Sequence, residues 1–167
     1  MEHENLLRDQ LTGALIGLAR AADGSEHLIS HTTTRLIVEG LAALQTRRDE
    51  VVMEGLLGRI KEEKRRMIPN CFSCASPCGR TSDYDMENLR TADPQIRQLK
   101  ERILSAAGWV AVCFGTVTAQ NCPDENTRKF LYRALFTVGM DDWGREALCS
   151  VAEEAEAIRA RYSSLSW

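Results

Sequence analysis

Apolar residues recur at helical spacing along nearly the whole chain, and no stretch alternates between polar and apolar residues as a strand would. The first apolar stripe consists of Leu7, Leu11, Leu15 and Leu18. Six long segments carry such a stripe, and loops of a few residues separate most of them. The sequence therefore predicts an all-α protein of two tandem three-helix bundles, joined by a cysteine-containing segment with a short helix.

Capping residues, glycines and prolines set the expected helix boundaries. Helices are expected over residues 4–22, from the cap Ser25 to the next cap Asp49, from Asp49 to Pro69, and over residues 84–90, 94–120, 123–139 and 142–163. The short helix is expected to start at Ser82 or Asp83. Residues 1–69 would form the first bundle, 70–93 the cysteine segment and 94–167 the second bundle, all within one compact domain.

The expected core follows from the stripes of the later helices. Its further members are Leu36, Ile37, Leu41, Leu44, Val52, Met53, Leu56, Leu57, Ile60, Ile96, Leu99, Ile103, Val110, Phe114, Val117, Phe130, Leu131, Leu135 and Phe136. Cys113 and Cys149 lie beside apolar neighbours and are expected to be buried as small hydrophobic residues. The three tryptophans are expected to pack in the core or at helix ends.

Composition narrows the function classes. Hydrophobic residues make up 44% of the chain and charged residues 27%, as in soluble globular proteins. The net charge of −3 argues against a nucleic-acid partner. The uncharged run over residues 103–120 contains too many polar residues for a membrane span. We expect a cytoplasmic protein without membrane contact, in which cysteines stay reduced unless they bind metal or act in redox chemistry.

The two halves of the chain repeat weakly at a spacing of about 92–95 residues. Leu7 and Leu11 correspond to Leu99 and Ile103, and the pair Thr34-Arg35 corresponds to Thr127-Arg128. This correspondence indicates an internal duplication of a three-helix unit.

The long helix and the stretch "NTRKFLYRALFTVGMDDWGREALCSVAEEA" after it resemble the three-helix-bundle units of the hybrid-cluster protein family, also called prismane or hydroxylamine reductase proteins. The resemblance implies a region of two three-helix bundles. The family's cysteine cluster has a different spacing and precedes its helical region, and its two cluster-holding α/β domains do not fit in 167 residues. The chain is therefore expected to be related to a hydroxylamine reductase without being a complete one.

Three thiols gather in the one clear break of the helical pattern, as Cys71-x2-Cys74-x3-Cys78. Soft thiolates suit zinc and iron–sulfur clusters, and two thiols separated by two residues can reach one metal ion from a tight turn. Gly79 lets the backbone bend close to the ligands. We expect a zinc ion or an iron–sulfur cluster here, in a structural role or to carry electrons to a redox partner protein.

A closed tetrahedral site needs a fourth ligand. In an up-down-up bundle, the loop after the first helix lies at the same end as the end of the third helix, which brings His27 and His31 toward Cys71. Cys122, in the corresponding loop of the second unit, is the other candidate. The sequence leaves these three possibilities open.

Two alternatives remain. Cys71 and Cys74 could cycle between dithiol and disulfide in a thiol oxidoreductase, with Lys64, Arg65, Arg66 and Arg80 nearby to favour a thiolate. The chain could also be a metal-free interaction scaffold derived from the helical domain of a reductase. The sequence identifies no general acid or base, so no reaction is assigned.

Overall fold

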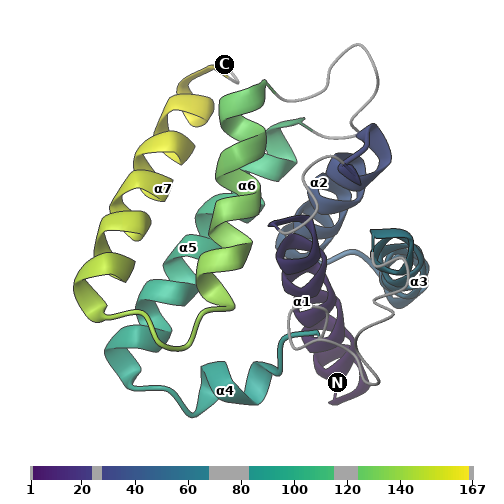
Figure 1. The fold of residues 1–167 in the computed structure, drawn as a ribbon, viewed down its shortest axis with the longest axis horizontal. Coiled ribbons are helices and arrows are strands. Elements are labelled where there is room, and N and C mark those ends of the chain that lie inside the picture. Colours follow the sequence, from purple (N-terminus) through teal and green to yellow (C-terminus); the bar gives the residue numbers. More distant parts are fainter. Residues whose placement is uncertain (1, 24–27, 68–82, 115–123, 166–167) are drawn as a thin grey trace.

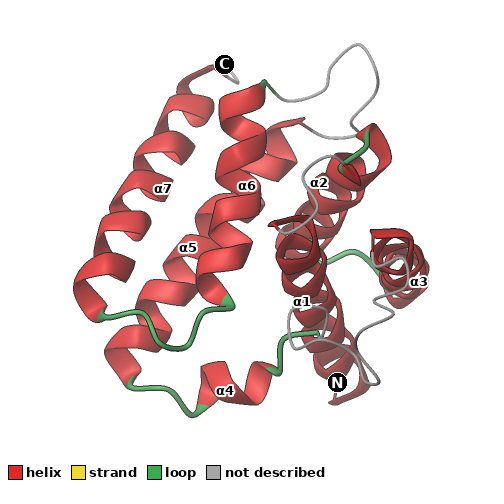
Figure 2. Cartoon of the chain, in the orientation of Figure 1, coloured by secondary structure: helices red, strands yellow, loops and turns green. Residues whose placement is uncertain are grey.

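The structure, a computed structural model, describes residues 2–23, 28–67, 83–114 and 124–165. Within these ranges the chain forms seven helices and no strand, which confirms the all-α prediction (Figures 1 and 2). The helices are α1 (Glu2–Asp23), α2 (His31–Thr46), α3 (Glu50–Met67), α4 (Met86–Arg90), α5 (Pro94–Phe114), α6 (Glu125–Val138) and α7 (Arg145–Leu165).

The helices α6 and α7 begin two and three residues later than the sequence predicted, and α2 and α4 also begin later. The cap of α2 is Ser30 rather than Ser25, because Ser30 exchanges hydrogen bonds with Thr33 in a reciprocal capping box. The cap of α4 is Asp85, whose carboxylate accepts the N–H of Glu87 at 3.0 Å, rather than Ser82 or Asp83. In both cases a side chain that satisfies a free backbone N–H of the first turn decides where the helix starts.

The predicted cap of α3, Asp49, agrees with the structure, whereas α6 begins after the cap Asp124 rather than at Pro123. The carboxylate of Asp49 accepts the N–H of Val52 at 3.0 Å at the start of α3. Asp124 accepts the N–H of Thr127 at 2.8 Å at the start of α6. Hydrogen bonds from the backbone and the side chain of Thr127 hold the pKa of Asp124 below its ordinary value.

The helices form two groups of three that share one core. In Figure 1, α5, α6 and α7 lie on one side, α1, α2 and α3 lie on the other, and α4 crosses below. The groups are joined mainly where α2 packs along α5 and α1 packs against α6. The predicted division into residues 1–69, 70–93 and 94–167 therefore stays a prediction.

Most of the predicted core positions that the structure describes are buried, and the rest are half-buried at its edge. The half-buried ones that pack against the core are Leu44, Val52, Leu57, Ile96 and Phe114; Phe136 is also half-buried, and Val117 lies outside the described residues. No described helix has a stretch long and apolar enough to cross a membrane.

The prediction for the two helical cysteines was wrong for Cys113 and is confirmed in part for Cys149, which packs partly buried against the core. Cys113 is exposed because it lies one turn after Trp109, which is itself 40% exposed, on the same side of α5. Cys149 is half-buried and lines an open groove between α5 and α7.

The tryptophans differ from one another. Trp109 is exposed rather than packed in the core, and the guanidinium carbon of Arg159 lies 5.3 Å from its ring centroid. Trp143 is half-buried against the core.

Candidate functional site

The segment that carries the three predicted ligands begins after α3 and ends before α4. Cys71, Cys74 and Cys78 lie outside the described residues, as do two candidate fourth ligands, His27 and Cys122. The structure therefore does not test whether these side chains come together. It does show where the chain on either side of the segment is attached.

An ion pair joins the two flanks of the cysteine segment. The ammonium of Lys64, in the last turn of α3, lies 2.6 Å from the carboxylate of Asp83. Met67, the last residue of α3, is buried. The chain therefore returns to the described structure, at Asp83, within reach of a lysine in the last turn of α3.

The residue after Asp83 is fixed to α1. The backbone N–H of Tyr84 donates to the carbonyl oxygen of Gly13 at 3.1 Å. The chain crosses α1 so closely that a Cβ at position 13 would collide with the carbonyl oxygen of Tyr84. Gly13 is thus required for this close approach, and the crossing anchors the C-terminal flank of the cysteine segment.

His31 lies at the end of the bundle from which the cysteine segment departs. Arg66, one residue before the end of α3, donates to the carbonyl oxygen of Leu28 at 2.6 Å and to the hydroxyl of Thr33 at 3.4 Å. The start of α2 and the end of α3 are therefore neighbours, as the up-down-up topology predicted. His31 is exposed as the first residue of α2.

A second polar cluster, which sequence reasoning missed, surrounds Tyr84. The phenol of Tyr84 donates to the carboxylate of Asp141 at 2.6 Å, and the ammonium of Lys100 donates to the same oxygen at 3.0 Å. The side chain of Lys100 is only 1% exposed, whereas that of Asp141 is 49% exposed. Asn88 donates to the other oxygen of Asp141 at 3.4 Å. We refer to Tyr84, Lys100 and Asp141 as the polar junction.

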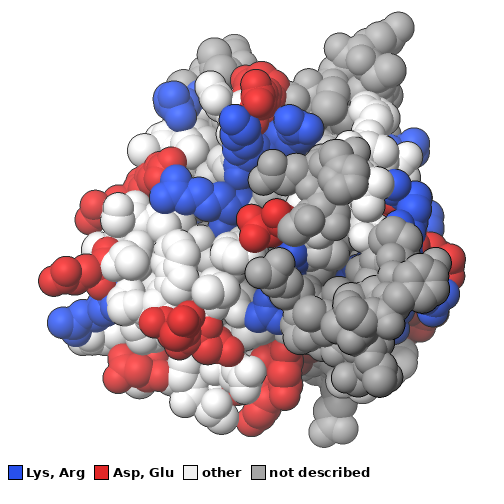
Figure 3. Space-filling model, viewed as in Figure 1, with Lys and Arg blue, Asp and Glu red and all other residues white. Residues whose placement is uncertain are grey.

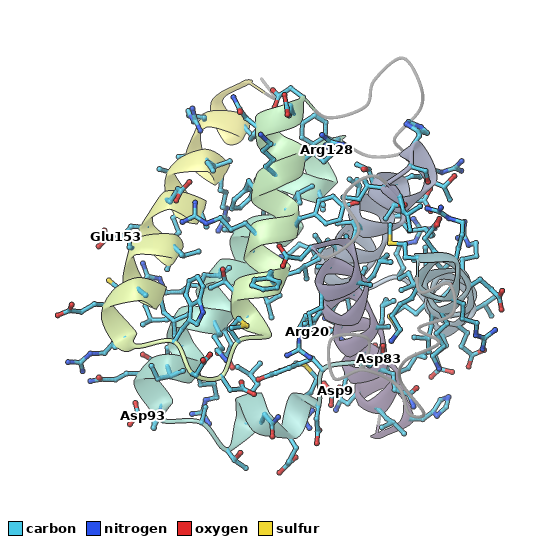
Figure 4. The ribbon with its side chains drawn as sticks, viewed as in Figure 1. Asp9, Arg20, Asp83, Asp93, Arg128 and Glu153 are labelled. Atoms are coloured by element: carbon cyan, nitrogen blue, oxygen red, sulfur yellow. The ribbon has the colours of Figure 1, made fainter. Side chains whose placement is uncertain are left out.

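Arg20 completes the surroundings of the polar junction. Its guanidinium carbon lies 5.3 Å from the centroid of the Tyr84 ring, and the guanidinium also donates to the carbonyl oxygen of Gly139. Figure 4 shows Arg20 reaching from α1 toward the turn after α6. The junction thus connects α1, α5 and the turn between α6 and α7.

The electrostatics of the polar junction keep its phenol neutral and its carboxylate charged. Burial raises the pKa of Tyr84, and its hydrogen bond to Asp141 raises it further. Burial also raises the pKa of Asp141, but the hydrogen bonds from Tyr84 and Lys100 outweigh burial and hold the pKa below its ordinary value. Since donors and acceptor are matched, the arrangement indicates a structural joint rather than a proton-transfer site.

One further group of metal-type ligands lies among the described residues. The ring nitrogen Nε2 of His3 is 3.8 Å from carboxylate oxygens of both Glu50 and Glu54, and all three residues are exposed. Exposed acidic side chains beside a histidine are common on helical surfaces and do not by themselves indicate a metal ion. The cluster is therefore explained as a surface contact between the starts of α1 and α3.

No family model matches the chain, and no curated protein or solved structure is significantly similar to it. The resemblance to the hybrid-cluster protein family consequently stays a prediction from the sequence.

Proposed function

We propose that this chain is a metal-binding helical-bundle protein, in which Cys71, Cys74 and Cys78 hold a zinc ion or an iron–sulfur cluster. The observation that supports this proposal most directly is the ion pair between Lys64 and Asp83, which joins the two flanks of the cysteine segment. Joined flanks reduce the entropy lost when ligands of the same segment converge on one ion. The relation to hybrid-cluster proteins rests on sequence resemblance alone.

The donor set suits both kinds of metal centre. Three thiolates are typical ligands of structural zinc and of iron–sulfur clusters, and each centre usually takes a fourth protein ligand. We propose His31 as that ligand, because it is exposed at the end of the bundle where α3 ends. His27 and Cys122 are the alternatives. Bound zinc would stabilise the fold, whereas a cluster would carry electrons to a redox partner protein.

The thiol oxidoreductase alternative receives less support from the surrounding charges. Every cation in the last turn of α3 has a carboxylate within ion-pair distance: Lys64 pairs with Asp83, Arg65 with Glu62 and Arg66 with Glu63. Cations that are already paired lower the pKa of a neighbouring thiol less than unpaired ones do.

The test is metal analysis of protein purified without oxygen, together with its visible absorption spectrum. We expect near-stoichiometric zinc without colour, or iron with sulfide and a visible absorption band. Cys74→Ser should lose the metal, while Cys113→Ser, which alters an exposed thiol on α5, should retain it. His31→Ala should release the metal to a chelator faster than the wild-type chain does.

Absence of metal from the wild-type protein, with Cys74→Ser equally stable, would contradict the proposal and favour the metal-free scaffold. A disulfide between Cys71 and Cys74 found by mass spectrometry in metal-free protein would instead favour the oxidoreductase. If metal is present but His31→Ala retains it as well as the wild type does, His27 or Cys122 becomes the candidate fourth ligand.

A further inference from the structure

A cleft of about 540 Å³ lies between the C-terminal part of α1 and α6. This volume is within the range of small-molecule sites, roughly 300–1,000 Å³, and such sites often lie between helices of a bundle. The apolar part of its lining consists of Ala19, Ala22, Ile29 and Phe136. The cleft therefore offers a hydrophobic surface where the two groups of helices meet.

Two opposite charges line this cleft without ion-pair partners in the described part of the chain. Arg128 is half-buried on α6, and Asp23 is exposed at the end of α1. The other cations on the rim are matched: Lys129 pairs with Glu125 at 3.2 Å, and Arg133 pairs with Glu154 at 3.0 Å. Arg128 and Asp23 do not pair with each other either.

Each of these two charges has the same sign as the helix-dipole end near which it lies. Asp23 is the last residue of α1, where the helix dipole is negative, and Arg128 follows the start of α6, where it is positive. Figure 3 shows basic side chains gathered over α6 on this face, and Figure 4 shows Arg128 on the side of α6 that faces α1 and α2. One side of the cleft thus favours an anion and the other a cation.

We propose that this cleft binds a free α-amino acid with an apolar side chain. Its carboxylate would accept two hydrogen bonds from the guanidinium of Arg128, a fork that fits a carboxylate well. Its ammonium group would lie against Asp23, and its side chain would cover the apolar lining. A simple carboxylate or amine would leave one of the two charges unmatched. This inference does not depend on the cysteine segment.

The test is isothermal titration calorimetry of the full chain with L-leucine and with L-phenylalanine. We expect saturable binding of at least one of them, weakened roughly tenfold or more by Arg128→Met and by Asp23→Asn, since hydrogen bonds to charged groups contribute that much. The matched controls Arg65→Met and Asp142→Asn alter exposed charges outside the cleft and should bind like the wild type. Circular dichroism verifies that each variant is folded.

Two analogues of leucine separate the contributions of its charges. We expect 4-methylpentanoate, which lacks the ammonium group, and 3-methylbutan-1-amine, which lacks the carboxylate, to bind more weakly than leucine. Equal binding of either analogue would overturn the assignment of an amino acid. So would an absence of saturable heat with both amino acids up to roughly 10 mM, or equal loss of binding in the control variants.

Discussion

Removal of the Asp141 carboxylate should destabilise the protein more than removal of the lysine that pairs with it. The side chain of Lys100 is 1% exposed, and its ammonium donates a hydrogen bond to Asp141 at 3.0 Å. Loss of one partner from a fully buried ion pair costs about 3–5 kcal/mol. Asp141 is 49% exposed, so water can enter its place and hydrate part of the ammonium that is left without a carboxylate. We therefore expect Asp141→Ala to lower the free energy of unfolding by about 2–3 kcal/mol.

Lys100→Met should have a smaller effect. Methionine occupies much of the space of the lysine stem, and Asp141 remains hydrated and bonded to Tyr84 at 2.6 Å. We expect a loss of about 1 kcal/mol or less, because replacement of a buried charge by an apolar side chain is often nearly neutral. In the double variant Lys100→Met/Asp141→Ala no ammonium is left unpaired. Its loss should therefore be smaller than the sum of the two single losses by about 1–2 kcal/mol.

Urea unfolding followed by far-UV circular dichroism measures these differences, and an unchanged dependence on urea concentration confirms that the variants unfold from comparable states. Two results would refute the reasoning. One is a loss in Lys100→Met as large as that in Asp141→Ala. The other is a double variant whose loss equals the sum of the single losses within about 0.5 kcal/mol, which would show that the two groups are not coupled.

Gly13→Ala should lower the free energy of unfolding by about 1–3 kcal/mol, because its Cβ meets the Tyr84 carbonyl oxygen. Gly55→Ala, on the open side of α3, should raise it by about 0.5–1 kcal/mol. Midpoints of thermal unfolding that shift in the same direction for both variants would contradict this. Ser30→Ala should cost about 1 kcal/mol in urea unfolding, through loss of the α2 cap, and an unchanged midpoint would argue against the cap. Because the pKa of Asp141 lies below its ordinary value, its stabilisation should be complete above about pH 4 and be lost as the pH falls through the lowered pKa. Asp141→Asn should remove that part of the pH dependence of the unfolding free energy.

The positions of the core leucines could be predicted because burial of one helix face leaves a regular spacing in the sequence. Leu11 and Leu15 are one turn apart and fully buried, as the spacing requires. Helix starts were predictable only where one capping residue was available, as with Asp49. Ser25 and Ser30 are both favourable caps, and the choice between them depends on the bond between Ser30 and Thr33.

The exposure of individual residues on α5 could not be predicted in the same way. This helix packs against both α2 and α7, so its orientation depends on two partners that the sequence does not specify. Trp109 and Cys113 consequently face outward although their neighbours are apolar.

The burial of Lys100 could have been predicted from the sequence, since Lys100 lies one turn after Ile96 and in register with Ile103 on the apolar stripe. A buried lysine requires a partner for its ammonium, but the sequence could not identify Asp141, 41 residues away.

The polar junction also bears on the proposed metal site, because Tyr84 belongs to the junction and directly follows the C-terminal flank of the cysteine segment. The flank has two independent attachments, the ion pair of Asp83 with Lys64 and the bond from Tyr84 to Gly13. Asp141→Ala weakens the hold on the Tyr84 phenol but alters neither attachment. We therefore expect this variant to retain as much metal as the wild type does although it is less stable, measured by elemental analysis of folded protein. Loss of metal would mean that the ligands depend on the junction, and hence on packing between the two groups of helices. If Asp141→Ala keeps its metal and Lys64→Met loses it, metal binding depends on the ion pair between Lys64 and Asp83 that joins the two flanks.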